Sequence, residues 1–450
     1  MDPIVAVLAC LKPALPSVVR RQLTVIVVAM LTMTGRVTMA GMARWAGRGG
    51  SYRTIQRFFQ THVPWASLCW LVFRDHHHRP DSVYLLAGDE TVVTNAGTAT
   101  HGVDRFFSSI YGAPVPGLAF FALSLVSVNE RRAFPMAIEQ VIRTPADTAA
   151  TNAKKVARNQ PPAAERRTPG RPKGSRTRSK TDRPLSPELQ RIGTMIGSLT
   201  QRIAPLVPLT YLLLDGYFGH AAALQMARAQ NLHLISKLRT DAALWLPYTG
   251  RYAGRGPRQI YGDKLNYRAL PDTTVQTTTT VGTITTRIVQ VQLLHKEFPQ
   301  PLNVVIIQKT NAQTGKQAHV ILFSSDLDLP AATIIDYYGL RFQIEFNFRD
   351  AKQHWGLEDF MNVTPAAVTN AANLALFMVN VAAALVPDQR VDDPPISILD
   401  LKTGYRGQKY IDVVLKVLPE KPDPVLLTEL MRTVTSLGRI HPRQPATSPP

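Results

Sequence analysis

The sequence predicts an α/β protein in which a mixed sheet is flanked by helices and preceded by a helical N-terminal region. Apolar runs of strand length recur between residues 82 and 138 and again between 209 and 238. Patterns of helical period precede, separate and follow these runs. Threonine- and valine-rich stretches of hairpin type fill residues 272–326. Because apolar strands flanked by helices are buried on both faces, they are expected to form one mixed sheet.

The bulk composition indicates several domains and a polyanionic partner. A chain of 450 residues is too long for one compact core, so two or three domains are expected. Lys and Arg number 51 against 32 Asp and Glu, which gives a net charge of +19. Such an excess favours nucleic acid over a membrane surface as partner. A ribosome-associated or merely basic protein remains the plainer alternative.

Cysteine content and hydropathy favour a soluble, cytoplasmic protein with no membrane partner. Cys10 and Cys69 are too few for a disulfide framework or a cysteine-based zinc site, so both are expected to be free thiols. The most apolar early run, residues 23–33, is too short to span a bilayer and is predicted to be a core helix.

Residues 1–80 are predicted to form a helical N-terminal domain that binds DNA. Helices are expected over 18–31, from a cap at Thr38, and from a second cap at Ser51 after a glycine-rich break. In the last of these helices Arg53 and Arg57 face outward. A helix, a glycine turn and a helix with exposed arginines are typical of a helix-turn-helix, although any small helical bundle shares the pattern. The adjacent His76, His77 and His78 diverge along the backbone, so a solvated linker is favoured over a metal site.

Four further segments follow the N-terminal domain. Residues 81–245 carry the apolar strands, 246–326 form a β-rich insertion, and 327–390 return to helices. Residues 391–450 are predicted to be a C-terminal helical region with a disordered tail from 441.

A basic insert interrupts the strand region at residues 151–185. It contains eleven basic residues against two acidic ones, a net charge of +9, many prolines and no apolar period. A flexible segment is therefore expected. Its Pro169–Gly174 core, with Arg171 and Lys173, resembles an AT-hook that lies in a narrow minor groove. A nonspecific phosphate-binding loop is the equally good alternative.

A polar stripe marks residues 336–352. If this stretch is one helix, Tyr338, Arg341, Glu345 and Lys352 share a face roughly 60° wide beside Phe342 and Phe346. The pattern suits a carboxylate that binds metal while its neighbours bind phosphate. An i,i+4 ion-pair face in fortuitous register is the alternative.

Two distant acids complement Glu345. Asp89 and Asp215 each stand at or near the end of an apolar strand, where a carboxylate is costly unless it holds metal or finds hydrogen-bond partners. Three carboxylates suit two Mg²⁺ ions, which can activate an attacking oxygen and stabilise a leaving one in phosphoryl transfer. Glu90 and Asp104 compete for the first position, and Asp215 could be a turn residue. Motifs of P-loop, serine-hydrolase and HExxH type are absent from the sequence.

These residues resemble the DDE transposases of bacterial insertion sequences. Tyr338, Arg341, Glu345 and Lys352 match the YREK signature of that family at every position. The stretches 88–91, 215–218 and 235–242 are similar to its other blocks. The resemblance implies an RNase H-like catalytic core formed by 81–245 and 327–390, interrupted by the β-rich insertion. It also implies that Asp89, Asp215 and Glu345 bind the metals, while Tyr338, Arg341 and Lys352 contact phosphates at the transposon end.

The sequence thus predicts an Mg²⁺-dependent DNA transposase, for which Mn²⁺ can substitute, that cuts transposon ends and performs strand transfer. Its expected partners are double-stranded DNA, as terminal inverted repeats and target, and a second copy of the chain, in the cytoplasm with the nucleoid. A nuclease without strand transfer and a non-catalytic DNA-binding regulator are the alternatives. In the family that the chain resembles, members that cut through a DNA hairpin hold a flipped base with an aromatic residue of the insertion. Residues 272–326 contain no Trp, only Phe298 and Phe323, with Trp245 just before them, so a DNA hairpin intermediate is doubtful.

Overall fold

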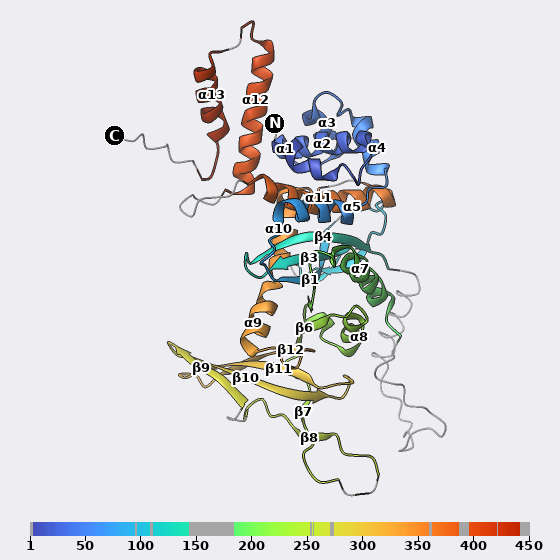
Figure 1. Cartoon of the computed structure of the whole chain (residues 1–450), viewed down its shortest axis with the longest axis vertical. Coiled ribbons are helices and arrows are strands. Elements are labelled where there is room, and N and C mark those ends of the chain that lie inside the picture. The colour runs from blue at the N-terminus through green and yellow to red at the C-terminus, as the bar shows by residue number, and fades with distance from the viewer. Residues whose placement is uncertain are drawn as a thin grey trace.

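The mixed α/β class is confirmed by the computed structural model, in which a large sheet is covered by helices and joined to a helical N-terminal region (Figure 1). The structure describes residues 3–94, 97–108, 111–143, 184–252, 254, 256–270, 274–359, 362–386, 396–420 and 422–441. The basic insert, with Arg171 and Lys173, lies outside the described residues apart from positions 184 and 185.

The core of the sheet follows the order β4-β3-β1-β5-β6. Its strands are β1 (Tyr84–Thr94), β3 (Ala113–Ser127), β4 (Arg132–Val141), β5 (Tyr211–Leu213) and β6 (His233–Leu238), and the short β2 (Asp104–Ser108) also pairs with β3. The pairs β1–β3 and β3–β4 are antiparallel, whereas β1–β5 and β5–β6 are parallel. This is the RNase H-like arrangement that the sequence predicts.

The β-rich insertion extends this same sheet. Its strands are β7 (Leu244–Pro247), β8 (Tyr261–Lys264), β9 (Val275–Val281), β10 (Ile284–His295), β11 (Leu302–Asn311) and β12 (Gln317–Ser324). The expected hairpins are present as the antiparallel pairs β9–β10, β10–β11 and β11–β12. Because β12 also pairs antiparallel with β6, hydrogen bonding continues from the core strands into the insertion.

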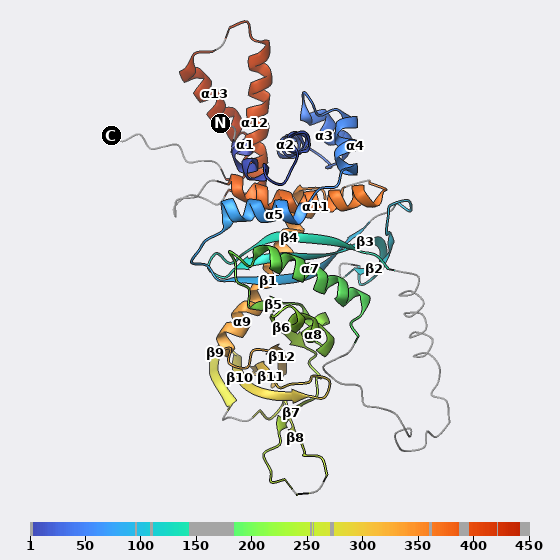
Figure 2. The ribbon, with the colours of Figure 1, turned by 45° about the vertical axis from the view of Figure 1, so that its right-hand side comes forward.

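The N-terminal helices pack on one side of α11 (Pro365–Leu385), and the core strands lie on the other (Figures 1 and 2). These helices are α1 (Pro3–Val7), the 3₁₀ turn η1 (Leu8–Leu11), α2 (Ser17–Thr32), α3 (Met39–Ala46) and α4 (Tyr52–Gln60). The next helix, α5 (Trp65–Val72), instead runs beside α11 and also contacts β4. The predicted caps are confirmed, since the Thr38 and Ser51 hydroxyls accept from the backbone N–H groups of Gly41 and Thr54. Among the described residues, α11 alone is long and apolar enough to cross a bilayer, but 83% of its apolar window is buried within the protein.

The expectation that His76, His77 and His78 form a solvated linker is wrong. His76 and His77 belong to η2 (Phe73–His77), a π-helical turn that continues α5. His77 is buried, stacks on Phe134 with ring centroids 4.8 Å apart, and its Nε2 lies 3.0 Å from the Asn380 carbonyl oxygen. Burial lowers the pKa of His77 to about 4. The sequence shows three consecutive polar residues, but tertiary contacts select one of them for the core.

The prediction of one continuous helix over 336–352 is also wrong. The chain forms α9 (Ala331–Leu340) and α10 (Gln343–His354), which are separated at Arg341 and Phe342. Around the break, backbone N–H groups bond three residues back, as from Arg341 to Tyr338 and from Glu345 to Phe342, which tightens the turn. The helical pattern continues through this break, so residue spacing alone does not reveal it.

The remaining helices lie around the sheet and at the C-terminus. They are α7 (Pro187–Ile203), the 3₁₀ turn η3 (Gly216–Phe218), α8 (Ala221–Ala229), α12 (Ile398–Val417) and α13 (Pro424–Ser436). The last two form a hairpin that projects away from the rest of the molecule (Figure 2).

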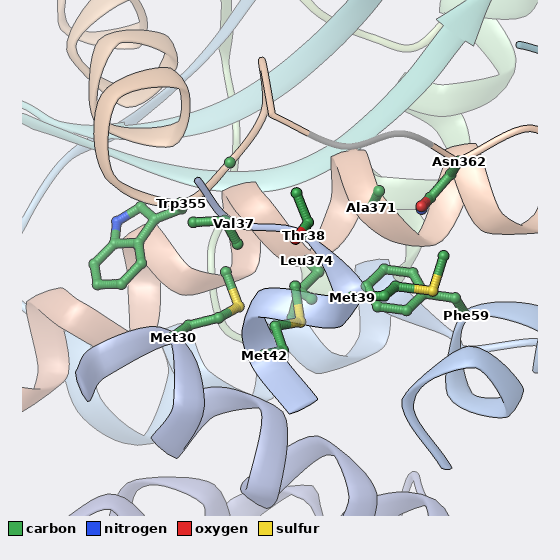
Figure 3. A pocket seen from close by; sticks show the side chains of 11 residues that line it. Met30, Val37, Thr38, Met39, Met42, Phe59, Trp355, Asn362, Ala371 and Leu374 are labelled. Atoms are coloured by element: carbon green, nitrogen blue, oxygen red, sulfur yellow. The ribbon is translucent and has the colours of Figure 1, made fainter. Parts of the chain in front are cut away.

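One junction ties the N-terminal helices to the end of α10. The Asp359 carboxylate accepts from the Val37 backbone N–H at 3.0 Å and pairs with the Arg36 guanidinium at 3.2 Å. Gly356, with φ of +80°, lies so close to Val37 that an added Cβ would stand 2.5 Å from the Val37 Cβ. A small, mostly apolar cavity remains beside this contact, between Met30, Met42 and Trp355 (Figure 3). The loop between α2 and α3 is therefore in direct contact with the segment that follows the helix of Glu345.

Candidate active site

Parallel pairing of β1 with β5 brings the first two predicted acids together. Leu86 lies beside Leu212 and Ala87 beside Leu213. Continuing the register by two residues places Asp89 beside Asp215, which follows the end of β5. Consistent with this placement, the charge of Asp215 raises the pKa of Asp89. Asp89 itself lies in the middle of β1, so the expectation that it stands at or near a strand end is wrong.

Helix α10 carries the third acid to the same place. Ile344 and Phe348 are buried in the core, and the Asn347 side-chain amide donates to the Ser124 hydroxyl of β3 at 3.2 Å. These contacts fix the rotation of α10 against the sheet. Glu345 then lies on the side of Asp89 of β1, with its side chain 40% exposed.

Arg341 connects two of the three acids. Its Nη1 lies 2.5 Å from Asp89 Oδ2, and its Nη2 lies 3.1 Å from Glu345 Oε1. The side chains of Arg341 and Asp89 are 14% and 17% exposed. Because this ion pair is shielded from water, it is stronger than a surface pair and costly to break from one side. The break between α9 and α10 lies at Arg341, where the guanidinium bridges β1 and α10.

The carboxyl group of Asp89 is strongly perturbed. Burial raises its pKa to about 6, although Arg341 and the backbone N–H of Glu90 act in the opposite direction. For Arg341, burial acts to lower the pKa, but the charges of Asp89, Tyr338 and Glu345 outweigh it and the pKa is raised. Perturbed acids that face a charged partner are typical of functional sites.

Asp215 is fixed by its own turn. Its side chain caps η3 by accepting from the Tyr217 backbone N–H at 3.1 Å, and its carbonyl oxygen accepts from the Ser236 hydroxyl at 2.7 Å. The turn role that the sequence left open is therefore real. It leaves the carboxylate near Asp89.

Tyr338 and Lys352 lie at opposite ends of the stripe. The guanidinium of Arg341 lies 6.0 Å from the centre of the Tyr338 ring, and burial raises the pKa of this phenol. The Lys352 ammonium donates to the Val92 carbonyl oxygen at 2.8 Å and pairs with Glu358 at 3.3 Å. Tyr338 thus belongs to the carboxylate cluster, whereas Lys352 is attached farther along β1.

The rival acids lie elsewhere. Glu90 alternates to the other face of β1, where burial raises its pKa; the charge of Glu188 acts in the same direction and that of Arg191 in the opposite one. Asp104, on β2, lies 3.7 Å from Arg143. Neither side chain has a contact with Arg341 or Glu345 among the interactions of the described residues.

Arg53 and Arg57 are exposed on α4, on the opposite side of that helix from the buried Ile55 and Phe58. They belong to the N-terminal helices rather than to the carboxylate cluster. Helix α4 therefore offers a separate basic face.

The carboxylates fit divalent ions by their chemistry, since oxygen donors are what Mg²⁺ prefers. In the arrangement that the structure describes, however, no group of three or more His, Cys, Asp and Glu side chains could hold a metal ion among the described residues. Arg341 is the cation that Asp89 and Glu345 share instead. A metal held jointly by these acids therefore requires the guanidinium to move away from at least one of them.

The sequence predicted that Arg341 would contact phosphate and gave no sign of its ion pairs with the acids, apart from its i,i+4 spacing to Glu345. The sequence also did not identify Glu188 as a neighbour of the site. This acid lies beside Tyr217, with 3.5 Å between Glu188 Oε2 and the phenol oxygen. An acid in the first turn of a helix is common for stability alone, so no sequence signal could have singled it out.

Two hollows of the described structure lie away from the carboxylates. One is the small cavity at the Val37 junction, and the other is a groove of about 340 Å³ between the ends of α7 and α8.

A comparison with protein-family models identifies the family of the chain. A family model described as DDE superfamily endonuclease matches residues 10–297, which include Asp89 and Asp215. A search of curated proteins finds no match. One similar solved structure is a cryo-EM structure of the piggyBac transposase synaptic complex with hairpin DNA, at 11% identity and a TM-score of 0.32. That match covers 78% of this chain and 57% of the other, and it is too distant to carry an argument.

Endonucleases of this superfamily generally use divalent metal ions. The family match spans more than half of the 450-residue chain, so the chain belongs to the DDE superfamily endonucleases.

Proposed function

We propose that the protein is a DNA transposase of the bacterial insertion-sequence branch with the YREK signature, which cuts transposon ends and transfers them into target DNA. The observation that carries the proposal is the bridge of Arg341 between Asp89 and Glu345, with Asp215 on the neighbouring strand. This juxtaposition joins residues more than 250 positions apart, and all of them belong to the three blocks that resemble the transposases.

Each residue has a proposed role. Asp89, Asp215 and Glu345 hold two Mg²⁺ ions, or Mn²⁺, which would activate the attacking oxygen and stabilise the leaving one when bound. Arg341 turns from the carboxylates to a DNA phosphate, for which its planar fork is suited. Tyr338 orients the guanidinium, and its hydroxyl donates a hydrogen bond to a DNA phosphate oxygen. Lys352 binds a phosphate farther along the strand.

DNA recognition is proposed to lie outside the catalytic cluster. Arg53 and Arg57 on the exposed face of α4 would contact the terminal repeats, and the basic insert with Arg171 and Lys173 would add phosphate or minor-groove contacts. Two copies of the chain would act on the DNA.

The aromatic residues of 272–326 support cleavage in which the insertion holds no flipped DNA base. Phe298 and Phe323, the only Phe, Tyr or Trp side chains of residues 272–326, are both buried in the core. The Lys296 ammonium lies 4.6 Å from the centre of the Trp245 ring. We therefore keep hydrolytic cleavage as the proposed route.

The test compares Glu345→Gln with Glu297→Gln, an exposed glutamate of the insertion, on DNA that bears the element's ends. Glu345→Gln should lose at least 100-fold in cleavage while end binding changes little, because the amide cannot replace a metal-binding carboxylate. Glu297→Gln should cleave like wild type. Cleavage that survives Glu345→Gln would overturn the site assignment.

The same assay separates the alternatives. A nuclease without strand transfer would cut the ends but never join them to target DNA. A regulator would bind ends and leave them uncut even as the wild-type protein.

A further inference from the structure

A lysine lies in line with the two aspartates of the candidate site. The parallel register of β5 with β6, continued by two residues, places Lys237 beside Asp215. The Ser236 hydroxyl donates to the Asp215 carbonyl oxygen at 2.7 Å, so the chain still runs along β6 at this point. Because Asp89 stands on the other side of Asp215, the three residues form one charged row across β1, β5 and β6.

The charged row occupies one face of the sheet. Residues directly opposite each other on neighbouring strands point to the same face, and so do residues two positions apart on one strand. Two positions before the charged row stand Ala87, Leu213 and Ile235, which belong to one buried cluster with Ile334 of α9. The Lys237 side chain therefore points to the same side of the sheet as the two aspartates.

The stem of Lys237 lies against the turn that carries Asp215. A Cβ added to Gly216 would stand 3.2 Å from the Lys237 Cε, so the glycine leaves room for the lysine stem. The residue is nevertheless exposed. Its ammonium has no ion pair or hydrogen bond with any residue that the structure describes. Arg341 and Lys352, by contrast, both donate to acceptors of the protein.

Lys237 and Arg341 lie on opposite sides of the carboxylates. Helix α10, which follows Arg341, packs against β1, β3 and β4, whereas Lys237 belongs to β6 on the far side of β5. With neighbouring strands about 4.8 Å apart, the backbones of Asp89 and Lys237 are separated by roughly 10 Å. A DNA strand carries a phosphate about every 3.4 Å of helix axis, so one strand can reach both cations at once.

We propose that Lys237 binds a phosphate of the DNA strand that is cut, on the opposite side of the scissile bond from the phosphate that Arg341 binds. A lysine ammonium is a compact point charge and a common phosphate ligand. Two cations that flank the acids would hold the strand across them, with the scissile phosphate over Asp89 and Asp215. The inference rests on the proposed function, because it assumes that DNA is the substrate of these carboxylates.

The test removes one charge from each partner of the contact. Lys237→Met keeps an apolar stem beside Gly216, so its melting temperature should equal that of wild type. Its affinity for a duplex with an element end should fall about tenfold, as for one charge-assisted contact, and Lys237→Arg should restore most of it. Fluorescence anisotropy without divalent metal measures the affinity, so that no DNA is cut during the measurement.

A scan of the DNA identifies the phosphate. Single neutral methylphosphonates are placed one by one around the cleavage site. At one phosphate the substitution should weaken wild type about tenfold and Lys237→Met less than twofold, because the charge that it removes has already lost its partner. Arg341→Met should lose its sensitivity at a different phosphate, on the other side of the scissile bond.

The matched control is Lys309→Met, which removes a lysine that is exposed on β11. Lys309 lies four residues after Val305, which pairs with Leu322, which in turn pairs with Lys237, so both lysines point to the same face of the sheet. Lys309 is two strands farther from the carboxylates. Its variant should bind like wild type and keep the full sensitivity to every methylphosphonate.

Three results would overturn the proposal. The first is a Lys237→Met variant that stays as sensitive as wild type at every position. The second is a shared position for Lys237 and Arg341. The third is normal affinity with slow cleavage, which would mean that Lys237 acts only through the turn of Asp215. Wild type that cuts and joins ends without this coupling leaves the proposed function intact, whereas coupling in a protein that never cuts overturns the proposed function alone.

Discussion

At the scale of single residues, the candidate site is organised by one cation between two acids. The sequence grouped Asp89, Asp215 and Glu345 as one metal site and assigned Arg341 to DNA phosphate, because each stood in a recognisable block. It could not show that Arg341 would lie 2.5 Å from Asp89, since that contact joins positions 252 apart and depends on strand register. The pKa of Asp89, raised to about 6 by burial, is likewise a property of the folded site alone.

Replacing Arg341 should show how far its charge stabilises the buried Asp89. Arg341→Met leaves Asp89 buried without its counter-charge, so the free energy of unfolding in metal-free buffer should fall by about 2 kcal/mol. The two freed carboxylates should then bind Mg²⁺ more readily, and added Mg²⁺ should raise the melting temperature of the variant more than that of wild type. Urea unfolding and thermal melts with and without Mg²⁺ measure both effects.

Arg239→Met provides the control for Arg341→Met. Arg239 also pairs with a carboxylate, Asp241, but both side chains are largely exposed at 84% and 69%. Its removal should change stability by less than about 0.5 kcal/mol and leave the Mg²⁺ response as in wild type. Equal behaviour of the two variants would contradict the role given to Arg341.

At the scale of elements, the sequence predicted helices and strands well where a periodic pattern met a cap. Ser51 and Thr38 opened the helices they were expected to open, and the apolar runs became β1, β3 and β4. The failures came where tertiary contacts act on a regular pattern. The pattern of 336–352 is helical throughout, yet the chain breaks at Arg341. His77 is polar in sequence but enters the core.

Two glycines in this region should respond oppositely to alanine. Gly356→Ala combines a left-handed backbone with a Cβ 2.5 Å from the Val37 Cβ, so it should lower the free energy of unfolding by more than about 2 kcal/mol. Gly339→Ala, inside α9 with open space around the new Cβ, should raise it by up to about 1 kcal/mol. Denaturant unfolding of the two variants tests the contact between the N-terminal helices and the end of α10. Similar stability changes in both would contradict it.

At the scale of the whole molecule, the sequence predicted the order of segments but not how they join. The insertion was expected as a separate β-rich unit, and only the pairing of Ile321 with Leu238, along with its neighbours, shows that it prolongs the core sheet.

The charge of the molecule yields the last prediction, on how DNA binding depends on salt. Each phosphate contact adds about 0.9 to the slope of log K against log salt, so a chain of net charge +19 should bind DNA with a steep slope. Deleting residues 154–183, which removes eleven basic and two acidic residues, should reduce the slope by about 5 or more, equally for end DNA and random DNA.

Replacing Arg53 and Arg57 together by Ala should reduce the slope by only about 2 and should weaken binding to end DNA more than to random DNA, because α4 is proposed to read the ends. Fluorescence anisotropy titrations over a range of salt concentrations measure both slopes. An unchanged slope after the deletion would show that the insert does not touch DNA, and a uniform loss for the arginine variant would assign α4 to phosphate contact alone.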